Sequence, residues 1–305
     1  MPIYKIRNDK LTPVKEKKIL LEKNIQKLTE YNLDIVFGLT FVSTEFTVQS
    51  FRIDTLAYDE ASNSFVIIEY KRDRSFSIID QGFSYLSLLL NNKDSFIIEY
   101  AKKLNVDLNK INIDWTQSKV LFVAQNFTSY QQNAINFKDL PIELWEVSKF
   151  EESLIFFNKL KSAEGSESIN KITKNKAIKK VSSEIKKYSI EDHFKNDWIS
   201  RDIFNLLRDR IFSLDKRIEE VPTKTYIGYK IGSLVLFNIT TRSNKIEVQL
   251  YRVKPSDLTD QENKLKYIEK SMEHWNKHVS KFFIDSEDDI EYAIFLIKQV
   301  YKKFG

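Results

Sequence analysis

The sequence feature that most constrains this chain is a pair of apolar segments that carry charged residues at one end. Residues 51–58 and 65–71 are rich in Ile, Val, Phe and Tyr, and polar turn residues separate them, which predicts a β-hairpin. Asp54 lies in the first segment, and Glu69 and Lys71 end the second. Alternate strand residues share a face, so Glu69 and Lys71 share theirs with apolar positions. Burial of an unpaired charge is costly, so these groups need partners or a metal ion.

The three charged residues suggest a chemical role. Two carboxylates from neighbouring strands can hold a divalent cation such as Mg²⁺, which prefers oxygen ligands. A lysine two residues after the second carboxylate can position or deprotonate a water, or stabilise charge on a phosphate. The alternative is a surface hairpin in which Glu69 and Lys71 form a solvated ion pair.

The order of these residues resembles the PD-(D/E)XK nuclease superfamily, and most closely its NucS/EndoMS-type mismatch endonucleases. The matching residues are Arg52, Asp54, Glu69, Lys71 and Gln81, and Ile53 stands where the superfamily name has proline. The resemblance implies a restriction-endonuclease-like α/β domain, with a mixed sheet flanked by helices. It also implies a nuclease that uses Mg²⁺ or Mn²⁺ and acts on nucleic acid, specifically DNA.

A helix before the hairpin supplies another candidate carboxylate. Thr12 and Pro13 predict a helix start, and the helix continues to Asn32. In the resembling nucleases this helix carries a glutamate ten residues before a terminal asparagine, which implies Glu22 as a third metal ligand. The alternative for Glu22 is an ordinary solvated helix residue.

Three arginines near the motif are candidate contacts for nucleic-acid phosphates, namely Arg52, Arg72 and Arg74. Exposed arginines at strand ends are also commonly just solvated. Glu45, on a strand predicted over residues 39–49, is expected to be a cross-strand partner of Arg52 or Lys71 and not a catalytic residue.

The next predicted helix, over residues 78–90, places Gln81 and Tyr85 on one face. Gln81 is expected to position a water or a phosphate oxygen, and Tyr85 is expected in the core. Apolar runs at residues 119–124 and 142–147 predict two further strands with a helix between them. The resulting order of elements favours a mixed sheet flanked by helices.

The length of 305 residues allows two domains. We expect a nuclease-like domain over residues 1–160, a linker over 161–188 and an α+β accessory domain over 189–305. Eight lysines and three glutamates between residues 161 and 187 favour a flexible linker. The last domain resembles a small C-terminal domain of unknown function through three segments: YIGYKIG, His274-Trp275 and DDIEYAIFLIKQVY.

The sequence also limits the function classes. There is no phosphate-binding loop, no serine-hydrolase elbow and no dinucleotide fingerprint. The sequence has no cysteine, and neither a signal peptide nor an apolar run long enough to span a membrane is recognised in it. We therefore expect a cytoplasmic protein that does not contact a membrane. The prediction is a metal-dependent DNA endonuclease using Asp54, Glu69 and Lys71. The alternative is an inactive nuclease-fold module that binds nucleic acid or a protein. Many members of the superfamily act as dimers, but the sequence does not decide on a homodimer.

Overall fold

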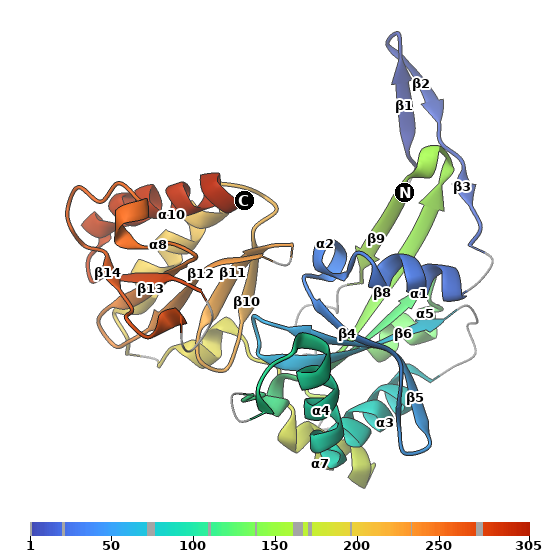
Figure 1. Ribbon diagram of the computed structural model, residues 1–305. Helices are drawn as coiled ribbons and strands as arrows, with labels where there is room; N and C mark the ends of the chain where they lie inside the picture. Colours follow the sequence, from blue (N-terminus) through green and yellow to red (C-terminus); the bar gives the residue numbers. More distant parts are fainter. Residues whose placement is uncertain are drawn as a thin grey trace. The chain divides into compact units, whose positions relative to one another are not determined.

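The computed structural model describes residues 2–19, 22–71, 77–108, 111–137, 139–160, 167–169, 173–195, 197–232, 234–272 and 277–305. The chain divides into two compact units, residues 1–187 and 188–305, each with its own hydrophobic core (Figure 1). Arg72, Arg74, His274 and Trp275 lie outside the described residues.

The elements of unit 1 are, in chain order, β1 (Tyr4–Arg7), β2 (Lys10–Pro13), β3 (Glu16–Lys17), α1 (Glu22–Glu30), α2 (Leu33–Phe37), β4 (Thr40–Val48), β5 (Phe51–Asp59), β6 (Ser64–Lys71), α3 (Ile78–Asn91), α4 (Lys93–Leu104), β7 (Lys119–Ala124), α5 (Ser129–Ala134), β8 (Ile142–Phe150), β9 (Ile155–Lys159) and α7 (Lys176–Glu184). The larger sheet has the order β3-β8-β7-β6-β5-β4, with β9 also paired to β8. Strands β6, β7 and β8 are parallel, and the other pairs are antiparallel.

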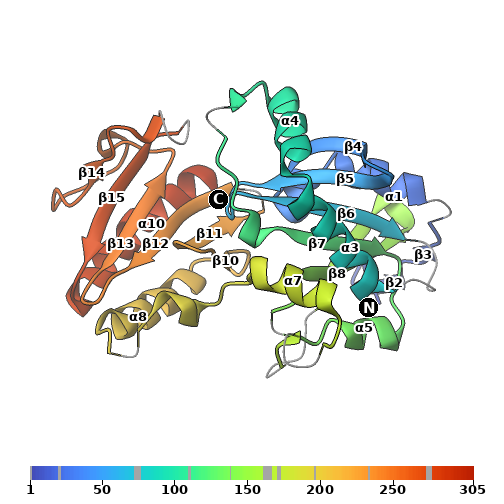
Figure 2. The same ribbon diagram turned by 90° about the horizontal axis from the view of Figure 1, so that it is seen from below.

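The central strand β6 is buried on both faces, which explains its nearly continuous apolar sequence. Helices α3, α4 and α7 cover one face of the sheet, and α1 and α2 cover the other (Figures 1 and 2). The predicted fold class, a mixed sheet flanked by helices, is therefore confirmed. Because β6 and β7 are parallel and β5 is antiparallel to β6, the carboxyl ends of β6 and β7 lie at the same end of the sheet as the start of β5. Such a row of strand ends is called a sheet edge here.

The first 20 residues differ from the sequence prediction. The helix expected from Thr12 begins instead at Glu22, and residues 4–13 form the β1–β2 hairpin. Asn8 and Asp9 both have positive φ angles, of 47° and 57°, and Asn and Asp adopt this conformation in tight hairpin turns more readily than most residues. Apolar and polar residues alternate on both sides of this turn, so the period is that of a strand and not of a helix.

The structure also differs from the prediction between residues 161 and 187. Before this segment, β9 turns back to pair with β8. Part of the expected flexible linker forms helix α7, and Ile178, Val181 and Ile185 are buried in the core with α3. Their spacing of three and four residues gives α7 an apolar face, although lysines dominate its composition.

Unit 2 contains α8 (Ser200–Phe212), β10 (Glu219–Pro222), β11 (Ile227–Ile231), β12 (Leu234–Thr241), β13 (Ile246–Tyr251), β14 (Lys266–Tyr267), β15 (Val279–Ile284) and α10 (Ile290–Phe304). Its antiparallel sheet has the order β10-β11-β12-β13-β15-β14, and α8 and α10 share its core. This is the expected α+β architecture. Within the described ranges, no helix in either unit has the length and apolar character needed to span a bilayer.

Candidate active site

The register of the β5–β6 hairpin brings two of the predicted metal ligands together. Thr55 pairs with Ile68, so the next pair along the register is Asp54 and Glu69. Asp54 Oδ2 accepts a hydrogen bond from the Tyr70 backbone N–H at 3.0 Å, and the Asp54 carboxyl group is close enough to Glu69 for each to shift the pKa of the other. Two carboxyl groups from adjoining strands therefore meet at one sheet edge.

Glu69 is only 4% exposed, and its two oxygens have different surroundings. Lys71 Nζ donates to Oε1 at 3.1 Å, and the Tyr85 hydroxyl is close enough to this carboxyl group to lower its pKa. Oε2 is buried, and no donor among the described residues reaches it. A buried acceptor without a donor is uncommon in native structures and suggests an additional partner such as a metal ion.

The pKa of Glu69 is raised to about 7, first by burial and then by the neighbouring Asp54 charge, against the opposing effect of Lys71. The pKa of Asp54 is also raised by burial, although the Tyr70 N–H and Lys71 oppose this shift. Two close carboxyl groups in a poorly solvated place cannot both ionise readily. Without a cation between them, the pair therefore favours retention of a proton near neutral pH.

Helix α3 brings the tyrosine to this carboxyl group. Gly82 lets α3 approach the sheet closely, since a Cβ atom there would lie 2.4 Å from Ile142 Cδ1. One turn later Tyr85 is buried, as predicted, and Gln81 Nε2 donates to its hydroxyl at 3.4 Å. The sequence analysis missed the proximity of the Tyr85 hydroxyl to Glu69. The only signal for it was the spacing of four residues from Gln81.

Helix α1 supports the start of β5 from the other face of the sheet. Gln26 Nε2 donates to the Asp54 carbonyl oxygen at 2.9 Å and to Glu30 Oε1 at 3.1 Å. Glu22 is the first residue of α1, is exposed, and lies one turn before Gln26. Among the described residues, no group of three or more Asp, Glu, His or Cys side chains is placed to hold a metal ion. The role of Glu22 as a third ligand stays a prediction.

The neighbouring strand β4 contributes a further charge. Arg52 Nε lies 2.8 Å from Glu45 Oε2, which confirms the expected cross-strand pair. Glu45 lies opposite Asp54 in the register and has a φ of 51°, a region that non-glycine residues rarely adopt. Its charge adds to the rise in the pKa of Asp54. The phosphate contact of Arg52 stays a prediction.

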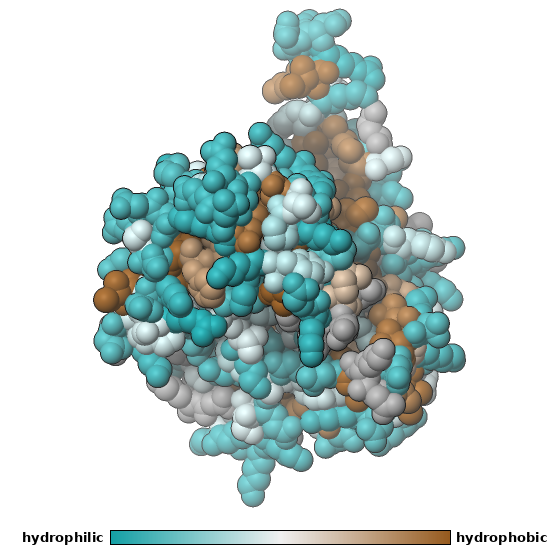
Figure 3. Space-filling view, turned by 60° about the vertical axis from the view of Figure 1, so that its left-hand side comes forward, coloured by the Kyte–Doolittle hydropathy of each residue, from teal (hydrophilic) through white to brown (hydrophobic). Residues whose placement is uncertain are grey.

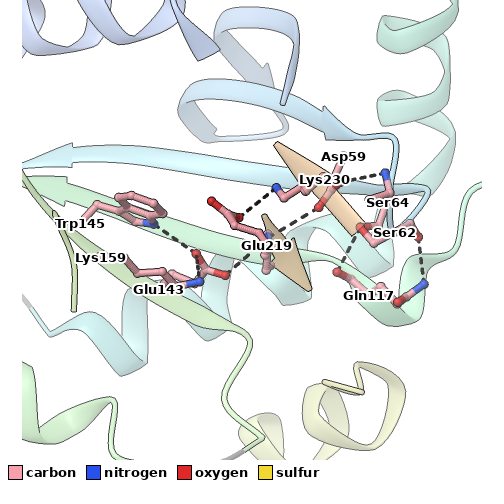
Figure 4. Close-up of polar contacts among 11 residues, drawn as sticks. Asp59, Ser62, Ser64, Gln117, Glu143, Trp145, Lys159, Glu219 and Lys230 are labelled. Atoms are coloured by element: carbon pink, nitrogen blue, oxygen red, sulfur yellow. Dashed lines mark hydrogen bonds and ion pairs between the residues drawn. The ribbon is translucent and has the colours of Figure 1, made fainter. Parts of the chain in front are cut away.

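A second charged cluster, at the opposite edge of the sheet, provides a contrast. Glu143 accepts hydrogen bonds from Lys159 at 2.9 Å and from the Trp145 indole at 3.1 Å (Figure 4). Lys119 lies 3.4 Å from Glu143 and 3.7 Å from Asp59. Although burial opposes it, Lys119 and Lys159 hold the pKa of Glu143 below its usual range. Both carboxylates have cationic neighbours here, which is typical of a structural ion network.

The Asp54–Glu69 pair, in contrast, has the chemistry of a divalent cation site. Both groups supply oxygen ligands, and one buried oxygen lacks a donor among the described residues. Mg²⁺ is commonly held by one or two protein carboxylates, with waters and substrate phosphates completing its coordination. The residues present therefore fit Mg²⁺ or Mn²⁺.

Comparison with solved structures finds DNA repair endonucleases at low similarity. A repair endonuclease from Pyrococcus abyssi is 16% identical with a TM-score of 0.26, and the match covers 43% of this chain and 49% of that one. A complex of EndoMS with double-stranded DNA is also 16% identical, with a TM-score of 0.22 over 42% of this chain and 57% of that one. This chain thus spans about half of these proteins, and neither fold nor function is inferred from scores this low.

Sequence comparison gives a clear relationship. No family model matches the chain. An uncharacterized protein of Haemophilus influenzae is 38% identical over 306 residues, which cover 99% of this chain and all of the relative. The chain belongs to the same family as this Haemophilus influenzae protein.

Proposed function

We propose that unit 1 is a metal-dependent nuclease that hydrolyses phosphodiester bonds in DNA. The observation that carries this proposal is the Asp54–Glu69 pair, in which Glu69 Oε2 is buried and has no donor among the described residues. Asp54 and Glu69 would hold Mg²⁺ or Mn²⁺. Such an ion, when bound, polarises a phosphate and lowers the pKa of a water molecule.

Lys71 has two roles in this proposal. Its ammonium group orients Glu69 through the 3.1 Å bond to Oε1. It also places a positive charge at the sheet edge, where it can hydrogen-bond the attacking water and stabilise charge that develops on the phosphate. Lys71 is partly exposed, so its head group can reach both Glu69 and a substrate.

Tyr85 and Gln81 act behind the carboxyl group. The Tyr85 hydroxyl lowers the pKa of Glu69, and Gln81 donates to that hydroxyl at 3.4 Å. The two residues support the ionised form of Glu69 from the α3 side, which is the form that binds a cation. Gln81 would also be a candidate for positioning a water or a phosphate oxygen.

The alternative is a non-cleaving module that binds nucleic acid or a protein. The observation that favours it is that the described residues gather two carboxylates at this edge and no third ligand. Binding by such a module would not depend on Mg²⁺ and would tolerate Asp54→Asn.

The test is cleavage of end-labelled single-stranded, nicked, mismatched and duplex DNA with Mg²⁺, Mn²⁺ or EDTA. Wild type should cleave at least one substrate with metal, and Glu69→Gln and Lys71→Ala should each lose at least about 100-fold, as expected when a group that stabilises the transition state is removed. Glu60→Gln, on the exposed β5–β6 turn, is the matched control and should retain activity. Equal cleavage by all four proteins would indicate a contaminating nuclease and refute the proposal.

A further inference from the structure

The β1–β2 hairpin is a two-stranded ribbon with two unlike faces. The cross-strand pairs alternate between apolar and polar residues. One face carries Tyr4, Ile6, Leu11 and Pro13. The other face carries Lys5, Arg7, Lys10 and Thr12. Figure 1 shows the hairpin extending beyond the ends of β8 and β9.

The apolar face of this ribbon is unusually open to solvent. Ile6 is 71% exposed and Leu11, its cross-strand partner, is 64% exposed. Hydrophobic side chains lie among hydrophilic ones on the hairpin at the top of Figure 3. An isolated two-stranded hairpin is only marginally stable in water, so this projecting ribbon would gain order from a binding partner.

The hairpin joins the body of unit 1 at the sheet edge that carries the candidate site. Lys71 pairs with Ala124, which pairs with Glu146, and β8 continues four residues further to Phe150. Glu16, just after the hairpin, pairs with Phe150. With strands about 5 Å apart and a rise of about 3.3 Å per residue, Glu16 lies roughly 20 Å from Lys71, and the base of the hairpin at Pro13 lies roughly 25–30 Å from it.

The charge of this segment identifies the partner. Residues 2–19 contain six lysines and arginines and two acidic residues, a net charge of +4, while the whole chain carries +5. Nucleic-acid phosphates are the polyanion that such a segment binds, with an affinity that falls as salt rises. A two-stranded ribbon also fits the major groove of B-DNA, where apolar side chains can contact thymine methyl groups.

We propose that the β1–β2 hairpin is a DNA-binding arm that holds duplex DNA to one side of the candidate active site. Its basic face contacts the phosphate backbone, and Ile6 and Leu11 contact the groove. The position of the scissile bond relative to the arm rests on the proposed nuclease function, but binding by the arm does not.

A second copy of the chain is a less suitable partner for the same surface. A stable interface between proteins needs about 20–30 residues from each side, and the apolar face of this ribbon offers four. Pairing two such hairpins would also bring two basic segments together, at an electrostatic cost.

The test compares two double variants that each remove two positive charges. Arg7→Ala/Lys10→Ala changes the tip of the arm. Lys102→Ala/Lys103→Ala changes exposed lysines on α4, where Lys103 lies over Phe41 at the opposite edge of the sheet. Affinity for a labelled DNA duplex is measured in EDTA at several salt concentrations, so cleavage does not interfere. In the arm variant, the slope of log affinity against log salt concentration should become less steep by about 2. At low salt this variant should bind the duplex at least about tenfold more weakly than wild type. The α4 variant should match wild type in both respects.

A third variant, Ile6→Ser/Leu11→Ser, should weaken duplex binding without changing the salt slope. The proposal is overturned if both charge variants bind with the same affinity and slope. It is also overturned if Ile6→Ser/Leu11→Ser converts a dimer to a monomer in sedimentation while DNA binding is unchanged. If the arm variant binds weakly but the wild type never cleaves, the arm stands and the nuclease function fails. If the wild type cleaves and the arm variant binds normally, the nuclease function stands and the arm proposal fails.

Discussion

At the residue scale, the chemistry proposed for unit 1 depends on the protonation of a single buried carboxyl group. Glu69 has an oxygen held by Lys71 and another without a donor among the described residues. Strand periodicity was enough to place Glu69 and Lys71 on one sheet face, and the register of β5 against β6 then adds Asp54 to it. The proximity of Tyr85 to Glu69 could not be predicted, because the rotation of α3 against the sheet depends on the packing of Gly82 on Ile142.

The pKa of Glu69 leads to a prediction for the metal-free protein. Burial raises this pKa from 4.5 to about 7, so Glu69 stabilises the fold when protonated. This stabilisation is complete below the pKa that Glu69 has in the unfolded chain, and it is lost as the pH rises through about 7. Glu69→Gln imitates the protonated group and keeps the contribution. The difference in free energy of unfolding, Glu69→Gln minus wild type, should therefore be about 2–3 kcal/mol more favourable to the variant at about pH 8 than at about pH 5.

The measurement is urea unfolding in EDTA at both pH values. Asp215→Asn in unit 2 is a control that should show no such change, since Arg217 and the Tyr301 hydroxyl lower the pKa of the Asp215 carboxyl group and keep it ionised at both pH values. The explanation is wrong if the difference between Glu69→Gln and wild type does not change with pH.

The hydroxyl of Tyr85 gives a second prediction at this scale. Tyr85→Phe removes a donor that favours the ionised form of Glu69, so the pKa of Glu69 should rise. Calorimetric titration near neutral pH should then show Mn²⁺ binding several-fold more weakly, with the loss shrinking at higher pH. Tyr58→Phe, whose hydroxyl bonds to Asn63 at the opposite sheet edge, should not change the affinity. A loss of the same size at every pH would indicate a structural effect only.

At the element scale, the buried strands were the most predictable part of the fold. β5, β6 and β7 have long apolar runs bounded by polar turns, and these patterns permit few other structures. The N-terminal hairpin and α7 were mispredicted because short segments rich in lysine carry weak periodicity. For α7, three buried apolar residues were sufficient to form a packed helix.

The close contact between α3 and β8 can be tested by substitution. Gly82→Ala should destabilise unit 1 by about 1–2 kcal/mol, because its Cβ would lie 2.4 Å from Ile142 Cδ1. Ile142→Val removes that atom, so the double variant should lose less stability than the two single changes added together. Thermal unfolding of the four proteins measures the coupling. Additive losses would show that the two residues do not conflict.

The assignment of α7 to unit 1 can be tested in the same way. Val181 is buried, so Val181→Asp should cost at least about 3 kcal/mol by placing a charge in the core shared with α3. Lys180→Asp, at an exposed neighbouring position, should have little effect. Equal unfolding midpoints in urea for the two variants would support the flexible linker that the sequence favours.

At the scale of the whole molecule, the chain has two compact units, and the proposed cation site lies in unit 1. Positive charge is in local excess at residues 161–187 (+5) and at residues 2–19 (+4), and the second of these segments adjoins the edge that holds Asp54 and Glu69. A cation site and a basic arm at one edge are what a metal-dependent enzyme acting on a polyanion needs.

The most direct test of the central claim is a crystal of the protein soaked in Mn²⁺ and examined by anomalous diffraction. We expect a peak shared by Asp54 and Glu69 Oε2, at about 2.0–2.3 Å from each oxygen, and no such peak in Glu69→Gln. An empty Asp54–Glu69 pair at saturating Mn²⁺, or carboxyl groups too far apart to share one ion, would contradict the account.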